Sequence, residues 1–353
     1  MKFLRLGFFI SCTLFFLLYP PPLEATGAET VNVPILCYHR VGPKVKSIYD
    51  LTPEMLEAQL QFFKENNYQP ITGIQYLKHQ KHPADLPEKP VVMTFDDGNK
   101  DHYTYVFPLL KKYGFAATFF VYPEAIAEKS DSQITWGELS EMAQAGMDIE
   151  SHTFTHPFLT ATGTRPDDPV YLRWLEHELR DSRILLEQKI QRNVALLAYP
   201  YGWYNCIIET EAFLAGYQGA FTVNWGTNSG NEDLFRLKRR AVSNNLSLFE
   251  LGKYLGSRSL PLEILSPRDT SIVEQKPLIK FRVLNPEIRK VNIIISKNKG
   301  EVSPDDRGVF VFSKFNIAKP GYYMIIVSGY DQEDQLYINS WGFDYQKSAK
   351  PVQ

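Results

Sequence analysis

The 353-residue sequence has little net charge and few cysteines. Its 38 Lys and Arg residues nearly balance its 40 Asp and Glu residues, which leaves a formal net charge of −2. This balance gives no electrostatic reason to expect a nucleic-acid partner. Cys12 lies within an N-terminal apolar run, so only Cys37 and Cys206 remain beyond it. Two thiols exclude a disulfide scaffold, and they leave two alternatives open, a single disulfide bond or two buried thiols.

A second long apolar run is also lacking. The only such run, from Leu6 to Tyr19, follows two basic residues and precedes three prolines and several small residues. That order predicts a secretory signal peptide, because the run is short for crossing a bilayer of roughly 30 Å. An uncleaved N-terminal anchor is the alternative. In both cases we expect no further transmembrane segment and a mature chain outside the cytoplasm, either secreted, at the cell surface or in the periplasm.

Hydrophobic residues make up 44% of the chain and charged residues 22%, which is typical of a folded protein with a sizeable core. From residue 33 to residue 260, strand-like and helix-like segments alternate. This alternation predicts a parallel sheet, either doubly wound or rolled into a barrel. The predicted strands are Val33–Tyr38, Val91–Phe95, Ala117–Val121, Met147–Ser151, Ala195–Tyr199 and Ala220–Val223. The predicted helices are Pro53–Asn66, Tyr105–Tyr113, Thr135–Ala145, Pro169–Gln191 and Glu209–Ala215. Thr135 and Glu138 predict a capping box at the start of the third.

The helical period disappears after Pro261. Short strands with turn clusters such as Lys297–Gly300 between them predict a small immunoglobulin-like β-sandwich. The predicted strands are Leu262–Leu265, Leu278–Leu284, Val291–Ser296, Val309–Ser313, Tyr322–Tyr330 and Leu336–Tyr345. We therefore predict four parts, which are a signal peptide or anchor (1–28), an α/β barrel (29–260), a β-sandwich (261–346) and a flexible tail (347–353).

Two adjacent carboxylates, Asp96 and Asp97, directly follow the predicted strand Val91–Phe95 and precede Gly98. Neighbouring side chains on an extended backbone point to different sides. The two carboxylates are therefore suited to two different roles. The alternative is a plain turn, since Asp and Gly both favour turns.

Two histidines, His152 and His156, follow the predicted strand Met147–Ser151. Pro157 disfavours a helical conformation at His156, which places the pair on a loop. Two imidazoles with one carboxylate leave coordination positions open, as in catalytic zinc sites. Both motifs follow the carboxyl ends of predicted parallel strands, where the active sites of barrels are built. The sequence therefore predicts that the histidines and the Asp pair form one metal site.

A third motif, Tyr199-Pro200-Tyr201-Gly202, also follows a predicted strand. It is either a plain turn or a rigid segment that offers a backbone amide to an oxyanion. In this order the three motifs resemble the polysaccharide deacetylases of the NodB-homology type, carbohydrate esterase family 4. The resemblance extends from about Val33 to Val242, and the opening segment Val33–Arg40 is similar to the poly-N-acetylglucosamine deacetylase branch.

This resemblance implies a distorted (β/α) barrel that removes N-acetyl groups from an N-acetylglucosamine-containing polysaccharide. It implies that Asp97, His152 and His156 bind a divalent metal ion, foremost Zn²⁺, with Co²⁺, Ni²⁺, Mn²⁺ and Fe²⁺ also compatible. Asp96 would be the general base that activates the attacking water. Tyr201, next to Pro200, would contact the substrate through its backbone N–H.

Two features of the family pattern are missing. The arginine that often orients the base is replaced by Ala198, and Arg239 is the candidate substitute, against the alternative that most of the basic cluster Arg236–Arg240 is solvated. No histidine follows His177, which lies on a predicted helix face exposed to solvent, so the general acid is unidentified. His39 is a candidate by position only. These departures leave two other functions open, a non-catalytic polysaccharide-binding protein and an O-acetyl esterase that uses the same site.

Overall fold

The structure is a computed structural model that describes residues 31–80, 82, 85–127, 130–160, 167–230 and 232–346. The chain from Val31 onward forms one compact unit. The predicted signal peptide or anchor (1–28) and the predicted tail (347–353) lie outside the described residues. Among the helices of the described ranges, none has the length and apolar character of a membrane span.

The first region of the chain is built on an eight-stranded sheet in which all strand pairs are parallel. The strand order is β7-β6-β5-β4-β3-β1-β8, and β2 lies beside β3. This order confirms the predicted α/β class. The strands are β1 (Ile35–Tyr38), β2 (Gln69–Ile71), β3 (Pro90–Phe95), β4 (Thr118–Val121), β5 (Asp148–Ser151), β6 (Leu196–Ala198), β7 (Gly219–Phe221) and β8 (Arg240–Ala241).

The segment that leads into β8 connects the two edges of this sheet. Leu237 forms a parallel bridge with Phe221 of β7, and three residues later Arg240 pairs with Leu36 of β1. One bridge and a strand of two residues therefore close the sheet on itself. A barrel closed so narrowly agrees with the distorted (β/α) barrel predicted from the sequence.

Alternating side chains of the barrel strands separate two apolar clusters. Val92 and Phe120 contribute to the smaller cluster, while Met93 and Phe119 contribute to the larger one, which also contains the buried faces of the surrounding helices. Because neighbouring strand residues point to opposite faces, the smaller cluster fills the barrel interior and the larger cluster lies between the sheet and the helices. This explains why these strands read as continuous apolar runs in the sequence.

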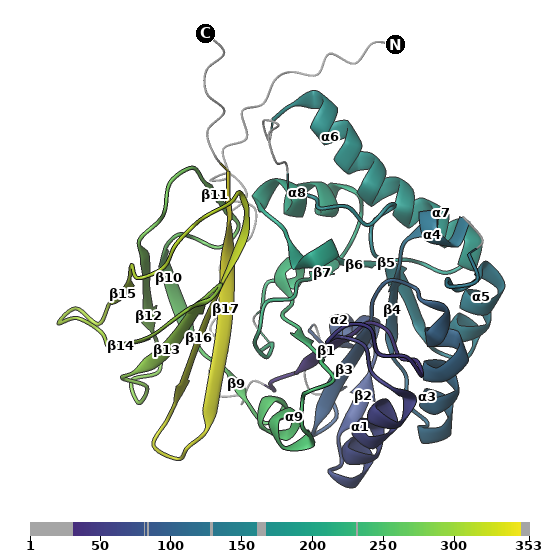
Figure 1. Cartoon of the computed structure of the whole chain (residues 1–353), viewed down its shortest axis with the longest axis horizontal. Helices are drawn as coiled ribbons and strands as arrows, with labels where there is room; N and C mark the ends of the chain where they lie inside the picture. The colour runs from purple at the N-terminus through teal and green to yellow at the C-terminus, as the bar shows by residue number, and fades with distance from the viewer. Residues whose placement is uncertain are drawn as a thin grey trace. The chain divides into compact units, whose positions relative to one another are not determined.

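Helices surround the barrel strands (Figure 1). The capping box predicted for α5 is confirmed, since the Thr135 side chain accepts from the Glu138 N–H and the Glu138 carboxylate accepts from the Thr135 N–H. The short helices α2 and α9 were not predicted. The helices are α1 (Pro53–Glu65), α2 (Gly73–His79), α3 (Phe107–Tyr113), α4 (Pro123–Ala127), α5 (Trp136–Gln144), α6 (Pro169–Glu176), α7 (Ser182–Ile190), α8 (Cys206–Leu214) and α9 (Leu248–Leu255).

The single regular helix predicted over residues 169–191 is wrong in one respect. A π-helical turn, His177–Asp181, separates α6 from α7. Such turns insert one extra residue into a helix and occur frequently at functional sites. Here the turn contains Glu178, a buried acid whose partners belong to the candidate site described below.

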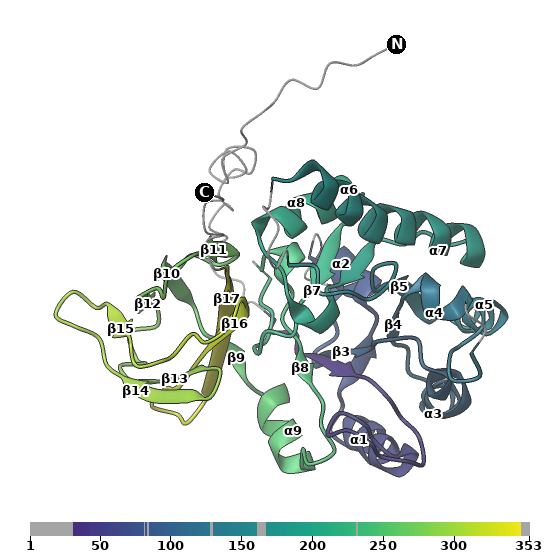
Figure 2. The same ribbon diagram turned by 45° about the horizontal axis from the view of Figure 1, so that its top comes forward.

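The second region consists of two packed sheets (Figure 2). One has the order β10-β12-β15, and the other has the order β11-β17-β16-β13-β14, with β9 beside β17. Buried aromatic residues such as Phe281, Trp341 and Phe343 form their shared core. The strands are β9 (Arg258–Ser259), β10 (Leu262–Ser266), β11 (Ser271–Val273), β12 (Ile279–Val283), β13 (Val291–Ile295), β14 (Asn298–Val302), β15 (Phe310–Phe312), β16 (Gly321–Tyr330) and β17 (Leu336–Tyr345).

This arrangement agrees with two packed β-layers, whereas the immunoglobulin-like topology stays a prediction. A turn separates β13 from β14 as predicted, but it consists of Ser296 and Lys297 and not of Lys297–Gly300, because β14 already begins at Asn298. Ile295 pairs directly with Asn298, so the loop consists of two residues, and Ser296 takes a positive φ of 54°. Tight two-residue hairpins require a positive φ in the loop. Ser and Lys are not residue types that predict this conformation.

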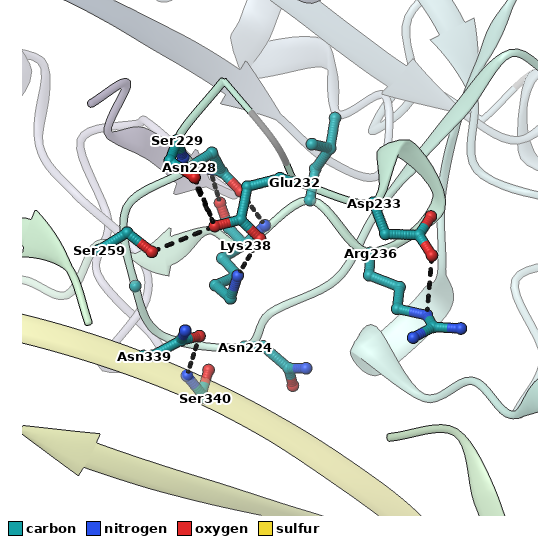
Figure 3. A network of polar contacts seen from close by, with 12 residues as sticks. Asn224, Asn228, Ser229, Glu232, Asp233, Arg236, Lys238, Ser259, Asn339 and Ser340 are labelled. Atoms are coloured by element: carbon teal, nitrogen blue, oxygen red, sulfur yellow. Dashed lines mark hydrogen bonds and ion pairs between the residues drawn. The ribbon is translucent and has the colours of Figure 1, made fainter. Parts of the chain in front are cut away.

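Polar contacts hold the segment between β7 and β8, and the one from Ser340 crosses the predicted boundary near residue 260. Figure 3 shows the Glu232 carboxylate, which accepts hydrogen bonds from Ser229, Lys238 and Ser259. On β17, Ser340 donates to the backbone carbonyl of Trp225 over 2.6 Å. These contacts fix the segment between β7 and β8, which is also the segment that carries Arg239.

Candidate active site

The predicted metal ligands converge at the carboxyl ends of the barrel strands. Asp97 follows β3 and His152 follows β5, and ligand atoms of Asp97, His152 and His156 all lie within 4.8 Å of one another. The Asp97 Oδ1 atom is 3.7 Å from the Nε2 of His152 and 3.4 Å from the Nε2 of His156. Parallel strands make this convergence inevitable, because their carboxyl ends meet at the same rim of the barrel.

His152 is held in one orientation and one tautomer. Its Nδ1 lies 2.8 Å from the backbone carbonyl oxygen of Ala198, and only 2% of the residue is exposed. A carbonyl can only accept, so Nδ1 carries the proton and Nε2 presents its lone pair toward Asp97. Burial lowers the pKa of His152 to about 4, which keeps the ring neutral near pH 7. A neutral imidazole fixed through its second nitrogen is the form that binds a metal.

Several site residues have left-handed backbone conformations. The φ angles are 80° at Asp97, 68° at Thr153, 59° at His156 and 59° at Tyr201. Residues with a Cβ avoid this region, and such strained positions cluster at active sites and ligand clamps. The strained backbone in the loops after β3, β5 and β6 therefore indicates a functional site and not simple turns.

Glu178 fixes the loop that contains the two histidines, and sequence reasoning missed it. Its carboxylate accepts from the backbone N–H groups of Phe154 and Thr155 and from the Thr155 hydroxyl, at 2.8–3.0 Å. The residue is buried. A signal was present, because Glu178 lies three residues after Leu175 and one before Leu179, within the apolar stripe of its helix. A charged residue in such a stripe requires buried partners.

Arg239 holds the predicted base, Asp96. Two guanidinium nitrogens donate to the two carboxylate oxygens of Asp96, each over 2.8 Å, and both residues are buried. Arg239 also donates to Thr94 and to the backbone carbonyl of Thr222, so its position is fixed by three partners. Burial alone would raise the pKa of Asp96, but the Arg239 guanidinium outweighs it and holds that pKa below its ordinary value. The carboxylate is therefore ionised.

The alternative prediction, that most of the basic cluster is solvated, is wrong. Arg236 makes two hydrogen bonds to Glu209, and Lys238 is buried and paired with Glu232. The Arg240 guanidinium lies 4.6 Å from the centre of the Trp225 ring. The cluster lies on the segment that closes the barrel, and this position largely removes its side chains from solvent. Buried cations require carboxylate or aromatic partners.

Cys37 is a neighbour of Asp96 that the sequence did not reveal. Neither Cys37 nor Cys206 forms a disulfide bond, which excludes the disulfide alternative. The Cys37 Sγ donates to Asp96 Oδ2 over 3.4 Å, and burial raises the pKa of this thiol. Ligand-type atoms of Cys37, His39 and Asp96 lie within 4.8 Å of one another, so His39 reaches the edge of the site. His177 does not, because it is exposed and pairs with Asp181.

The third motif forms one side of the site. Pro200 is buried, whereas 47% of Tyr201 is exposed. The Tyr201 ring is stacked on Phe158 at 3.8 Å between centroids and meets the His156 ring edge-on at 4.9 Å. An exposed aromatic pair therefore lies next to the Asp97–His152–His156 cluster.

Comparison with known proteins agrees with this geometry. A family model described as polysaccharide deacetylase matches residues 84–220, which include both carboxylates and both histidines. A putative polysaccharide deacetylase of Bacillus subtilis, YxkH, is 32% identical over 232 residues, covering 65% of this chain and 78% of that protein. The chain belongs to the polysaccharide deacetylase family. It is accordingly an enzyme of this class, and a purely non-catalytic role is set aside.

Other relatives of this deacetylase cover the same part of the chain. A poly-β-1,6-N-acetyl-D-glucosamine N-deacetylase of Escherichia coli is 28% identical over 233 residues, which is 57% of this chain but only 34% of that protein. The deacetylase PplD of Streptococcus pyogenes, solved with acetate, superimposes with a TM-score of 0.59 at 28% identity over 64% of this chain and 99% of that one. IcaB of Ammonifex degensii, at 24% identity and a TM-score of 0.56, shows the same fold.

Proposed function

We propose that this deacetylase is a metal-dependent hydrolase that removes N-acetyl groups from an N-acetylglucosamine-containing polysaccharide outside the cytoplasm. One observation carries the proposal. A buried carboxylate, Asp96, is held by Arg239 immediately beside the Asp97–His152–His156 cluster, with Asp96 Oδ2 3.9 Å from His152 Nε2. Relatives named as poly-β-1,6-N-acetyl-D-glucosamine N-deacetylases support the choice of substrate.

In this proposal, Asp97, His152 and His156 hold the divalent ion. Their donor set suits one, because two neutral imidazoles and a carboxylate present atoms within 4.8 Å of one another and leave coordination positions for substrate and water. A bound divalent ion would supply Lewis acidity that polarises the acetamide carbonyl and acidifies water. The same donors serve several metals, of which Zn²⁺ fits the nitrogen-rich set best.

Asp96 acts as the general base. A base must be ionised and held within reach of the proton it accepts. Arg239 satisfies both conditions, because it stabilises the carboxylate and fixes it through two hydrogen bonds. Tyr201 contributes its backbone N–H to the oxyanion of the tetrahedral intermediate, and its left-handed conformation serves that purpose. His39, at the edge of the site, is the candidate that protonates the departing amine.

The test is acetate release from β-1,6-linked N-acetylglucosamine oligomers by the purified chain. We expect release that stops with chelator and returns with Zn²⁺. His156→Ala should lose the metal and the activity together, whereas His177→Ala serves as the matched control, because this exposed histidine pairs with Asp181 and is not part of the Asp97–His152–His156 cluster. Metal content is measured in parallel by elemental analysis.

Two outcomes would overturn parts of the proposal. Full activity in the presence of chelator, with no metal in the protein, would remove the metal from the mechanism. Release of acetate only from O-acetylated glycans would make the chain an esterase that uses the same residues.

A further inference from the structure

A groove of about 250 Å³ lies between the turn after β6 and one face of the six-stranded sheet. On the barrel side it is lined by Tyr201, Trp203 and Val223. On the sheet side it is lined by residues of β13 and β16 and the turn after β13. These are Ile294, Ser296, Tyr322, Met324 and Ile326. The groove is therefore made jointly by the deacetylase barrel and by the region appended to it.

The sheet face that lines the groove is apolar. Met324 and Ile326 alternate along β16, so they share one face, and Ile294 of β13 pairs directly with Ile326. Ile325 and Val327 point the other way, into the core between the two sheets. An antiparallel sheet ordinarily has one core face and one solvated face. This sheet is apolar on both faces, so the face that lines the groove also has to be shielded from water.

The barrel covers only part of this second face. Ser340 and Asp344 of β17 lie opposite Ile326 and Tyr322, and both make hydrogen bonds to barrel residues. The Trp203 ring rests against Gly321 at the start of β16, where a Cβ atom would lie 2.8 Å from the ring. Ile294 and Met324 lie beyond these contacts and remain partly exposed in the groove.

The groove is continuous with the candidate active site. Tyr201 lines the groove, and its ring is 4.9 Å from that of His156. Phe158, which is 49% exposed, is stacked on Tyr201 and lies 4.7 Å from Trp203 between ring centroids. An aromatic surface thus leads from the histidine cluster to the C-terminal sheet.

We propose that this groove binds the polysaccharide next to the sugar being deacetylated, so that the C-terminal sheet forms part of the substrate-binding surface. The inference rests on the proposed function. Sugar-binding surfaces combine apolar faces with a few polar groups, and here Ser296 lies at the rim. The buried Tyr322 hydroxyl donates to Asn224 over 3.0 Å, which fixes the ring that lines the groove. The small volume suits a single ring of a chain that continues in both directions.

The experiment compares β-1,6-linked N-acetylglucosamine dimers and hexamers as substrates of the full chain. The wild-type protein should prefer the hexamer in kcat/KM, because only the longer chain reaches the groove. Ile294→Asn and Met324→Asn should each reduce this preference about tenfold, the usual effect of removing an apolar contact from a binding pocket. The matched control is Leu284→Asn, since Leu284 is an apolar residue of the same region, 59% exposed and outside the groove. It should keep the wild-type preference.

A binding measurement separates this inference from the proposed function. Hexamer binding to the Asp96→Asn protein is measured by calorimetry with and without Ile294→Asn. Binding that weakens about tenfold supports the groove, even if the wild-type protein releases no acetate and the proposed function fails. Unchanged preference and unchanged hexamer binding, in variants that melt at the wild-type temperature, would overturn the groove. If these variants lose self-association while their glycan binding is unchanged, the groove binds a second copy of the chain, and the inference is also overturned.

Discussion

Arg236 and Arg239 lie three residues apart on the segment that closes the barrel, and each holds a carboxylate through two hydrogen bonds. Arg239 binds Asp96 with both distances at 2.8 Å, and Arg236 binds Glu209 at 2.7 and 2.9 Å. Both carboxylates are buried. By the geometry of the ion pair alone, the two regions of the molecule are equivalent.

Their surroundings differ. Asp96 lies 3.9 Å from the Nε2 of His152 and beside the Asp97–His152–His156 cluster, whereas Glu209 shares its arginine with two further acids, Asp233 and Asp269. Burial raises the pKa of Glu209 to about 7, since these acids offset part of the influence of Arg236. The pKa of Asp96 is instead held below its ordinary value. We therefore propose a catalytic role for the first pair and a structural role for the second, and only the neighbouring groups distinguish them.

The largest expected effect comes from neutralising each carboxylate without changing its shape. Asp96→Asn should lower kcat about 10²- to 10⁴-fold, because it removes the proposed general base. Glu209→Gln should leave kcat within about twofold of the wild-type value, since Glu209 lies away from the histidine cluster. Steady-state acetate release by both variants, at equal metal content, checks the contrast. Equal losses in the two variants would abolish the distinction between the two regions.

Removing either arginine should destabilise the fold. Arg239→Ala and Arg236→Ala each leave a buried carboxylate without its main partner, which costs about 3–5 kcal/mol. Urea unfolding measures this loss. The combined changes Asp96→Asn with Arg239→Met, and Glu209→Gln with Arg236→Met, should recover most of the stability, because no charge is then left buried alone. Only the second combination should retain activity. An active first combination would contradict the role of Asp96.

The stability of the Glu209 region should depend on pH in a defined direction. The folded-state pKa of about 7 lies above the ordinary value of 4.5, so between these values the folded state binds more protons than the unfolded state. Stability therefore falls as pH rises through this window, by about 3 kcal/mol for this group. The free energy of unfolding of Glu209→Gln, measured from pH 4.5 to 7.5, should fall less steeply than that of the wild type. Parallel curves would place the Glu209 pKa near its ordinary value.

The smallest effect concerns a contact that only Asp96 has. Cys37→Ala removes the thiol hydrogen bond to Asp96 and should change kcat about threefold, or about 0.7 kcal/mol, as expected of a weak donor. Cys206→Ala is the matched control, since Cys206 is likewise outside any disulfide bond and lies at the start of α8. Steady-state kinetics should show no change for the control. A change larger than tenfold in Cys37→Ala would assign this thiol a direct role.

Local chemistry allowed much of the barrel to be predicted. The buried strand Pro90–Phe95 and the capped helix Trp136–Gln144 were found because apolar runs and capping boxes are properties of neighbouring residues. The failures were also local in origin. The helices Gly73–His79 and Leu248–Leu255 are too short for their periodicity to stand out, and the π-helical turn His177–Asp181 has no signal in residue types.

The sequence by itself determined the types and the order of the proposed ligands, because the motifs around Asp97, His152 and His156 place each residue just after a parallel strand. Tertiary structure alone decided that Arg239 pairs with Asp96, that Cys37 touches the same carboxylate and that Glu178 fixes the histidine loop. Arg239 and Asp96 are separated by 143 residues. No local pattern encodes a contact over that distance, since it depends on how the last strand closes the barrel. The closure of the sheet selects which of several basic side chains becomes buried beside the base.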